Sequence, residues 1–280
     1  MVAPATLLVA ALLWYPIGQA VYYSFTSWNG FSALWIGLGN YRSFANSPAF
    51  GNVLLHNFLL LASVPFVVLL PLIVALMVNA AGRAAAAFRS MLFVPAVLSW
   101  VVTGTVGIQL FATNGPIDSA LRGVGLGAIA LDWRSGASSS FVALSLLVIW
   151  ALFGINFIIF LSGLSTFDDS LYGAARVDGA GEVQILIRIV LPLMGPFVRF
   201  VTILSVTTMY TALFALIYVF TGGGPGYSTT TLEFYVYQLG FSSDEYGTAA
   251  AAGLVLLLLV FLVNLPQLRQ FLRHSGNDRV

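Results

Sequence analysis

The chain has 280 residues, of which 59% are hydrophobic and 8% are charged, and its formal net charge is +1. An ordinary soluble domain carries about 25% charged residues. This composition argues against a soluble globular protein and indicates a membrane protein in contact with lipid. A nucleic-acid partner is not expected.

Long charge-free segments recur along the chain, and each can hold the roughly 20 apolar residues that cross a bilayer. They are continuous and do not alternate, which favours helices over a barrel, because a helix satisfies its own backbone in lipid. In chain order, the predicted spans are residues 3–25, 53–79, 90–111, 140–163, 197–220 and 248–268. We therefore expect an all-α polytopic membrane protein with six transmembrane helices, forming one domain over residues 1–280.

The arginines predict the orientation of these spans. With six spans both termini lie on one side, and cytoplasmic segments near span ends are enriched in positive charge. If the termini are inside, three arginines lie outside (Arg42, Arg122 and Arg134) and eight lie inside: Arg83, Arg89, Arg176, Arg188, Arg199, Arg269, Arg273 and Arg279. Both termini are thus predicted to be cytoplasmic. The first span is preceded by no positive charge, so a basic N-terminal tail is either trimmed or unnecessary.

Cysteine and lysine are both absent. Without cysteine there is no disulfide, thiolate metal site or Cys nucleophile, and we expect no metal site. Without lysine the chain lacks the GxxxxGK[ST] phosphate-binding loop, so any ATP hydrolysis must belong to a partner. The exclusive use of arginine is also typical of a GC-rich genome, which favours a bacterial plasma (inner) membrane.

The segment 164–196, between the fourth and fifth predicted spans, indicates a helix, a turn and a second helix at the membrane surface. Asp168, Asp169 and Ser170 can cap the N-terminus of a helix of about two turns over Leu171–Val177. Gly179 then ends this helix, because glycine adopts the left-handed C-terminal conformation most easily. A second helix is expected from about Gly181 to Leu191.

Small residues give the first of these two helices little side-chain bulk. Gly173, Ala174 and Ala175 follow one another in it. They permit close approach by another protein, whereas a merely solvated loop would carry more charge. A docking element and a hairpin that only connects two spans both fit this spacing.

The same segment resembles the signature loop of the permease subunits of bacterial binding-protein-dependent ABC importers. That signature is Glu-Ala-Ala, three residues, Gly, nine residues, Ile, any residue and Leu-Pro. The matching positions here are Gly173, Ala174, Ala175, Gly179, Ile189, Leu191 and Pro192. Gly173 replaces the acidic residue, a departure that bears on any salt bridge from that position to the ATPase. Asp178 with Gly179 is typical of the sugar branch, which includes the maltose and glycerol-phosphate permeases.

Further segments resemble that branch, at residues 36–41, 56–57, 88–95, 221–225 and 246–253. The resemblance implies a type I importer fold, paired with a second homologous permease subunit. It also implies two ATPase subunits that bind ATP and Mg²⁺, an extracytoplasmic solute-binding protein and a sugar-like substrate. This chain is then a transporter subunit with no cofactor of its own and not an enzyme, and its loop with Asp178 couples it to the ATPases.

Polar and aromatic residues inside the spans are candidates for the substrate path. In the fifth span, Thr207, Thr211 and Phe214 accompany Val206 and Tyr210, and the last two match path-lining sites of the maltose permease by resemblance. Asn156 in the fourth span and Asn57 in the second are further candidates. Each of these side chains also fits a second interpretation, an interhelical hydrogen bond.

Near the outer end, Thr221–Gly226 is too rich in glycine to form a helix, and a short helix is expected over Thr230–Leu239. Glu233, Tyr235, Tyr237 and Gln238 on it face either the pathway or the binding protein, or form a solvated rim. Trp28, Trp35 and Trp133 are expected at the membrane interface.

Two other functions are alternatives to a sugar importer. A glycerol-phosphate or glycerophosphodiester importer of the same family should present positive charge along the path, and no arginine lies in a span core here, although the partner permease and the binding protein can also supply that charge. A secondary transporter would often carry charged residues inside its spans for ion coupling, and the charge-free segments contain none.

Overall fold

The computed structural model describes residues 3–80, 85–127 and 132–277 of the chain. Over these residues the fold is all-helical, as expected, and its only strand-like feature is an isolated bridge between Thr26 and Trp35. Arg83 and Arg279, which enter the predicted charge asymmetry, lie outside the described residues.

The helices are α1 (Ala3–Val9), α2 (Tyr15–Ser24), α3 (Gly39–Ala45), α4 (Phe50–Leu61), α5 (Val64–Ala80), α6 (Ala85–Val97), α7 (Trp100–Leu110), α8 (Pro116–Gly123), α9 (Ala137–Leu164), α10 (Asp169–Val177), α11 (Glu182–Ile185), α12 (Leu191–Leu193), α13 (Gly195–Thr211), α14 (Phe214–Phe220), α15 (Leu232–Tyr237) and α16 (Tyr246–Asn277). Short π-helical turns join α1 to α2 over Ala10–Trp14 and α11 to α12 over Leu186–Val190. A third, over Gln238–Ser242, extends α15.

Within the described residues, four helical segments are long and apolar enough to cross a membrane: Thr6–Ser24, Phe50–Asn79, Ala137–Leu164 and Tyr246–Pro266. Two bent helix pairs raise the number to six if each pair is one span. These six segments overlap the six predicted spans in order, but the fifth, Glu182–Leu193 with Gly195–Thr211, begins before the predicted span 197–220 and covers it only as far as Thr211.

The third predicted span, 90–111, is bent, because Phe88–Val97 and Trp100–Leu110 meet at 104°. Pro95 lies inside the first helix of this pair and lacks a backbone N–H. The side chain of Ser99, in extended conformation, accepts a hydrogen bond from the backbone N–H of Val102 and so caps the second helix. A proline followed by a new N-terminal cap accounts for the change of direction.

The fifth predicted span, 197–220, is two helices in the structure. α13 ends at Thr211 and α14 begins at Phe214, with Ala212 and Leu213 between them. The cause is a contact with Glu233, described below. α13 is also joined to the preceding segment Glu182–Leu193 at an angle of 57°.

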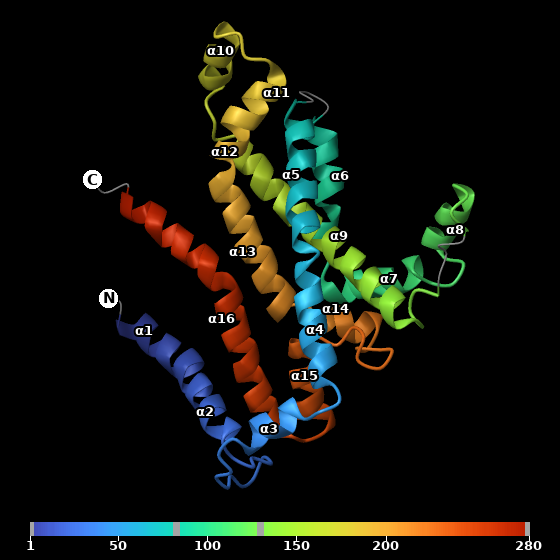
Figure 1. Ribbon diagram of the computed structural model, residues 1–280, viewed down its shortest axis with the longest axis vertical. Coiled ribbons are helices and arrows are strands. Elements are labelled where there is room, and N and C mark those ends of the chain that lie inside the picture. Colours follow the sequence, from blue (N-terminus) through green and yellow to red (C-terminus); the bar gives the residue numbers. More distant parts are fainter. Residues whose placement is uncertain (1–2, 81–84, 128–131, 278–280) are drawn as a thin grey trace.

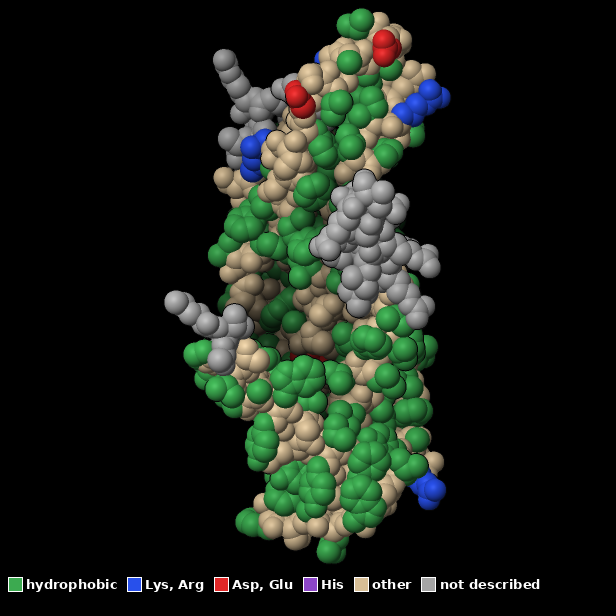
Figure 2. All heavy atoms as spheres, turned by 90° about the vertical axis from the view of Figure 1, so that its left-hand side faces the viewer, with side chains coloured by type: hydrophobic (Ala, Val, Ile, Leu, Met, Phe, Trp, Pro, Cys, Tyr) green, Lys and Arg blue, Asp and Glu red, His purple; other side chains and the backbone are tan. Residues whose placement is uncertain are grey.

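The molecule is elongated, with α10 and α11 at one end and α3 at the other (Figure 1). α2 and α16 lie side by side, and the ends of the helical chain in α1 and α16 are directed away from the α3 end. On the face in Figure 2, most charged side chains lie toward the two ends and hydrophobic side chains cover much of the middle. This distribution suits a protein embedded in a bilayer.

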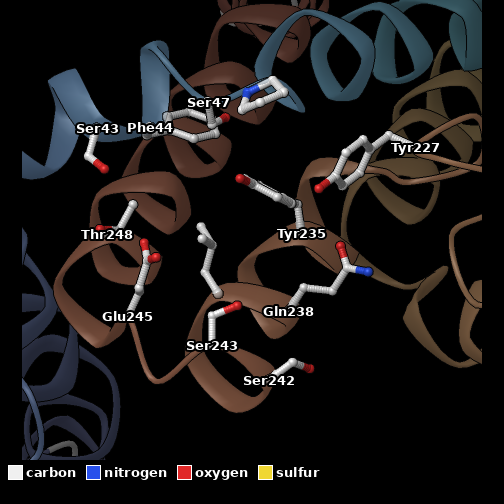
Figure 3. A pocket seen from close by; sticks show the side chains of 12 residues that line it. Ser43, Phe44, Ser47, Tyr227, Tyr235, Gln238, Ser242, Ser243, Glu245 and Thr248 are labelled. Atoms are coloured by element: carbon white, nitrogen blue, oxygen red, sulfur yellow. The ribbon is translucent and has the colours of Figure 1, made fainter.

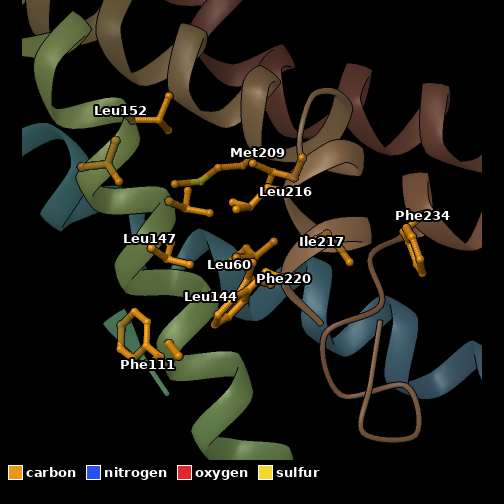
Figure 4. Close-up of a cluster of buried hydrophobic side chains, with 14 of the residues drawn as sticks. Leu60, Phe111, Leu144, Leu147, Leu152, Met209, Leu216, Ile217, Phe220 and Phe234 are labelled. Atoms are coloured by element: carbon orange, nitrogen blue, oxygen red, sulfur yellow. The ribbon is translucent and has the colours of Figure 1, made fainter. Parts of the chain in front are cut away.

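Three clusters of buried apolar side chains hold the helices together. The middle cluster joins α9 to α4, α13 and α14 and includes Leu60, Leu144, Leu147, Leu152, Met209, Leu216, Ile217 and Phe220 (Figure 4). The α10-end cluster includes Val68, Leu72, Phe157, Phe160, Ala175, Ile185, Val190 and Met194. The α3-end cluster includes Phe44, Val53, Leu232, Tyr235, Leu239 and Ala252.

The long helix α9 packs closely against α6 and α7 through glycines. A Cβ added at Gly154 would lie 2.9 Å from Ala96 Cβ and 3.1 Å from Leu92 O, and one at Gly107 would collide with Leu147 Cδ1. Small residues permit such close helix packing in membranes, where van der Waals contact drives association.

Trp133, expected as an exposed anchor at the membrane interface, is packed inside the fold. Its side chain is 6% exposed and belongs to the middle cluster. Its Nε1–H donates a hydrogen bond of 2.8 Å to Asp118 Oδ1. The indole is therefore a buried part of the fold.

Candidate functional site

The predicted helix, turn and second helix form the tip of the molecule at its α10 end (Figure 1). Asp168 Oδ1 accepts a 2.8 Å hydrogen bond from the backbone N–H of Ser170, which caps α10. Hydrogen bonds from the backbone and then the side chain of Ser170 hold the pKa of Asp168 below its ordinary value. Gly179 ends the helix with a φ of +80°, as its position predicted.

An ion pair that the sequence analysis did not anticipate spans this turn. Arg176 donates through Nε at 3.1 Å and Nη2 at 2.9 Å to the same oxygen, Oε1 of Glu182. The Gln184 side chain also accepts a hydrogen bond from the backbone N–H of Gly181 at 3.2 Å. Both interactions are local and exposed, so each contributes only modestly to the stability of the turn between α10 and α11.

The tip has one buried side and one open side. Ala175 and Ile185 belong to the α10-end cluster, which also contains residues of α5, α9 and α13. On the open side, a Cβ added at Gly173 would meet no atom within 4 Å, and Val177 is 89% exposed. The signature residues thus divide into an accessible surface and an anchor in the bundle.

The remaining signature residues follow the same division. Ala174 and Asp178 are exposed, and Ile189 is half-buried against the α10-end cluster. Leu191 and Pro192 form α12, which leads through Met194 into α13. The tip is therefore connected to the membrane helices by continuous backbone and by side-chain packing.

The two span asparagines predicted as path candidates point into this chain. Asn156 is fully buried, and its Nδ2 donates 3.0 Å hydrogen bonds to Val67 O and to Ser205 Oγ, which joins α5, α9 and α13. Asn57 is also buried and donates to Val53 O of its own helix at 2.7 Å. In this arrangement both Nδ2 groups are paired within the chain, whereas the Oδ1 atoms of Asn57 and Asn156 are buried and have no hydrogen-bond partner among the described residues.

The candidates of the fifth span divide between two faces. Val206 and Tyr210 are 3% and 1% exposed, within the bundle. Thr207 is half-buried, and Thr211 is exposed, with its Oγ1 donating to Thr207 O at 2.8 Å. The structure therefore does not bring all five candidates onto one surface of this chain.

The break between α13 and α14 is held by an acidic side chain from α15. Glu233 Oε2 accepts hydrogen bonds from the backbone N–H groups of Leu213 at 3.0 Å and Phe214 at 3.1 Å. Burial raises the pKa of Glu233 to about 7, and the two N–H donors oppose that rise. Glu233 is half-buried and links α15 to the break, so it does not stand in a solvated rim.

Beyond the break, Phe214 joins an aromatic cluster with Tyr218, Phe234, Tyr237 and Phe241. The ring centroids of Phe214 and Tyr237 are 4.7 Å apart, and those of Tyr237 and Phe241 are 5.4 Å apart. Tyr218 is 54% exposed and Phe241 is 77% exposed. Aromatic faces of this kind bury large area and can stack on flat or ring-shaped groups.

Comparisons with known proteins identify the family. The family model described as a binding-protein-dependent transport system inner membrane component matches residues 31–269. The chain is 30% identical to the multiple sugar-binding transport system permease protein MsmF of Streptococcus mutans, covering 94% of this chain and 91% of that protein. It is 31% identical to the arabinooligosaccharides transport system permease protein AraP of Halalkalibacterium halodurans, covering 96% and 85%.

A third relative is the sn-glycerol-3-phosphate transport system permease protein UgpA of Pectobacterium atrosepticum, 29% identical over 96% of this chain and 92% of that protein. Among solved structures, a bacterial ABC transporter for import of the acidic polysaccharide alginate contains a similar chain. Its TM-score is 0.78 at 22% identity, over 95% of this chain and 93% of that one. That likeness shows the fold.

These matches confirm the resemblance inferred from the signature loop and place the chain among transport components rather than enzymes. The matched region includes the tip, the broken fifth span and most of α16. The chain belongs to the family of inner membrane components of binding-protein-dependent transport systems.

Proposed function

We propose that this chain is a permease subunit of an ATP-driven importer that takes up a neutral di- or oligosaccharide delivered by an extracytoplasmic solute-binding protein. Two of the three relatives described above have names that refer to sugars. The predicted span cores contain no arginine, which suits an uncharged solute better than a phosphate ester. Uptake of glycerol phosphate, as named for the third relative, is the alternative.

The tip at α10 is the proposed contact with the ATPases, and one observation carries this assignment. The surface at Gly173 is open, while Ala175, two residues later, is buried in the α10-end cluster together with Ile185. A displacement of the exposed side by the ATPases would be transmitted to α5 and α9 through the packing of Ala175. It would be transmitted to α13 through the backbone of α12. Packed interiors transmit such displacements because they are close-packed.

The remaining partners follow from this assignment. Two ATPase subunits would bind ATP and Mg²⁺, because this chain lacks the lysine of a phosphate-binding loop. The α10 end would be cytoplasmic, and both termini with it, in a bacterial plasma membrane. A second, homologous permease would complete the translocation path.

The path is proposed to run along the contact between the two permeases. Thr207, Thr211 and Phe214 lie on the less buried side of the broken fifth span, where a second subunit can meet them. Val206 and Tyr210 would reach the path only after the helices move relative to one another, since both are buried here.

The test is ATP hydrolysis by the complex of both permeases and the ATPases in nanodiscs, with its binding protein. Lactose, maltotriose, arabinotriose, glycerol phosphate and a glycerophosphodiester are compared as solutes. Stimulation by a neutral sugar supports the proposal. Stimulation by the phosphate esters alone would assign the chain to glycerol-phosphate uptake instead.

A further inference from the structure

A polar pocket of about 450 Å³ lies at the α3 end of the molecule, opposite the α10 tip (Figure 3). Its walls come from α3 and the following loop, from α15 with its π-helical turn, and from the beginning of α16. Hydroxyl, carboxamide and carboxylate groups line it, among them those of Ser43, Ser47, Tyr235, Gln238 and Glu245. A pocket of this volume is within the range of small-ligand sites.

The lining fits an uncharged, hydroxyl-rich ligand. Hydroxyls both donate and accept hydrogen bonds, and the Gln238 amide does both through separate atoms. Tyr227 and Tyr235 stand edge to face at the rim, with ring centroids 6.2 Å apart. The lining includes the carboxylate of Glu245 and no basic residue. An anionic ligand would therefore meet a negative charge with no positive charge to offset it.

Two polar atoms of lining residues lack a partner in the described part of the chain. Ser47 Oγ and Gln238 Oε1 are buried and form no hydrogen bond there. Buried polar atoms in native proteins are nearly always hydrogen-bonded, and those left unpaired call for an explanation. The hydroxyls of a bound ligand can supply these hydrogen bonds after small side-chain rotations.

The walls of the pocket are held by side-chain packing and hydrogen bonds. Phe44, Tyr235 and Leu239 belong to the buried α3-end cluster. Asn40 of α3 donates 2.8 Å hydrogen bonds to Ser24 O and Thr26 O, which fixes α3 against the end of α2. A site that is formed before its ligand arrives avoids the entropic cost of ordering it.

We propose that this pocket binds one end of a neutral sugar on the side of the membrane where the binding protein releases it. The inference rests on the proposed import of a neutral sugar. It adds a location outside the spans that the path candidates do not include. It also explains why neutral sugars would be preferred over anionic ones, because Glu245 is the single charged residue of the lining and repels anions.

The absence of cysteine makes a direct test practical, since an introduced cysteine is the sole thiol of this subunit. Ser243→Cys places a thiol on the exposed part of the lining. Ser32→Cys is the matched control, because Ser32 is exposed in the loop that precedes α3 and is not among the lining residues. Both are labelled with a membrane-impermeant maleimide in the complex of permeases and ATPases, without binding protein.

The probes are lactose, maltotriose and raffinose, with trigalacturonate as a charged trisaccharide of comparable size. A sugar present at ten times its dissociation constant leaves about one site in eleven free, so labelling at Ser243→Cys is expected to slow about tenfold. Labelling at Ser32→Cys is expected to stay unchanged. Adding Gln238→Leu is expected to remove the protection by neutral sugars. Trigalacturonate is expected not to slow labelling at Ser243→Cys.

The pocket proposal is overturned if no neutral sugar slows labelling at Ser243→Cys. It is also overturned if the protection persists in Gln238→Leu, or if trigalacturonate protects as well as the neutral sugars do. ATP hydrolysis with binding protein is measured on the same preparation. Stimulation by a neutral sugar without protection at Ser243→Cys would refute the pocket while leaving the proposed function intact. Protection by maltotriose without any sugar-stimulated hydrolysis would refute the proposed function instead.

Discussion

The Oε2 atom of Glu233 accepts a hydrogen bond of 3.0 Å from the backbone N–H of Leu213, twenty residues earlier in the chain. The same oxygen accepts a second hydrogen bond from Phe214. These N–H groups begin α14 and have no partner within a helix, so an acidic side chain both satisfies them and suits the positive end of the helix. The fifth span is therefore fixed as two helices, and α15 is tied to the break.

Removal of this acceptor should destabilise the protein. Glu233→Ala leaves two backbone N–H groups without a partner, and each unsatisfied buried donor costs about 1 to 3 kcal/mol. Glu233→Gln keeps an acceptor oxygen of similar shape and is expected to lose much less. The midpoint of thermal unfolding of the purified complex measures both. A Glu233→Ala protein as stable as the unmodified one would contradict the role of this contact.

The same carboxyl group predicts a dependence of stability on pH. Its pKa is raised from an ordinary 4.5 to about 7 in the folded protein. A raised pKa contributes stability that is complete below the ordinary value and is lost as pH rises through the folded value. The unmodified complex should therefore lose stability between about pH 5 and pH 8 relative to Glu233→Gln. Parallel pH profiles for the two proteins would exclude this titration.

Asn156 offers a test between a path-lining role and a role in helix packing. Its side chain joins Val67 O and Ser205 Oγ across three helices. Asn156→Ala should lower stability by about 1 kcal/mol, the scale of interhelical hydrogen bonds in membranes. Combined with Ser205→Ala, the effects should be less than additive, and the order of sugars that stimulate hydrolysis should not change. A changed sugar preference with unaltered stability would instead support the path-lining role.

The close packing of α9 on α6 predicts that a glycine-to-alanine substitution destabilises the protein at Gly154 but not at Gly253. Gly154→Ala places a methyl group 2.9 Å from Ala96 Cβ, and overpacking of this kind costs about 1 to 3 kcal/mol. Gly253→Ala in α16 meets no atom within 4 Å and should be neutral or stabilising, because alanine favours a helix. Unfolding midpoints compare the two. Equal effects would show that the α6–α9 contact is looser than described.

The elements that sequence predicted best are those whose signals are local. The cap at Asp168, the left-handed turn at Gly179 and the proline at Pro192 lie within the segment that they shape. Charge-free length likewise predicted the spans, because the bilayer imposes that length directly.

What sequence did not predict depends on distant partners. The break after Thr211 depends on Glu233, and the burial of Trp133 depends on Asp118, fifteen residues away. Val206 and Tyr210, four residues apart in α13, are both buried in this chain. Which face meets the solute depends on a second permease that this sequence does not contain.

The central claim is that the α10 tip couples this permease to ATP hydrolysis. Gly173→Arg adds bulk and charge at a position where an added Cβ meets no atom within 4 Å, and Gly123→Arg does the same at the C-terminal end of α8, on the opposite side of the proposed membrane. Sugar-stimulated ATP hydrolysis in nanodiscs is compared for both, after equal membrane insertion has been verified. Loss of stimulation in Gly173→Arg with normal stimulation in Gly123→Arg is the predicted result. Normal stimulation in Gly173→Arg would contradict the account.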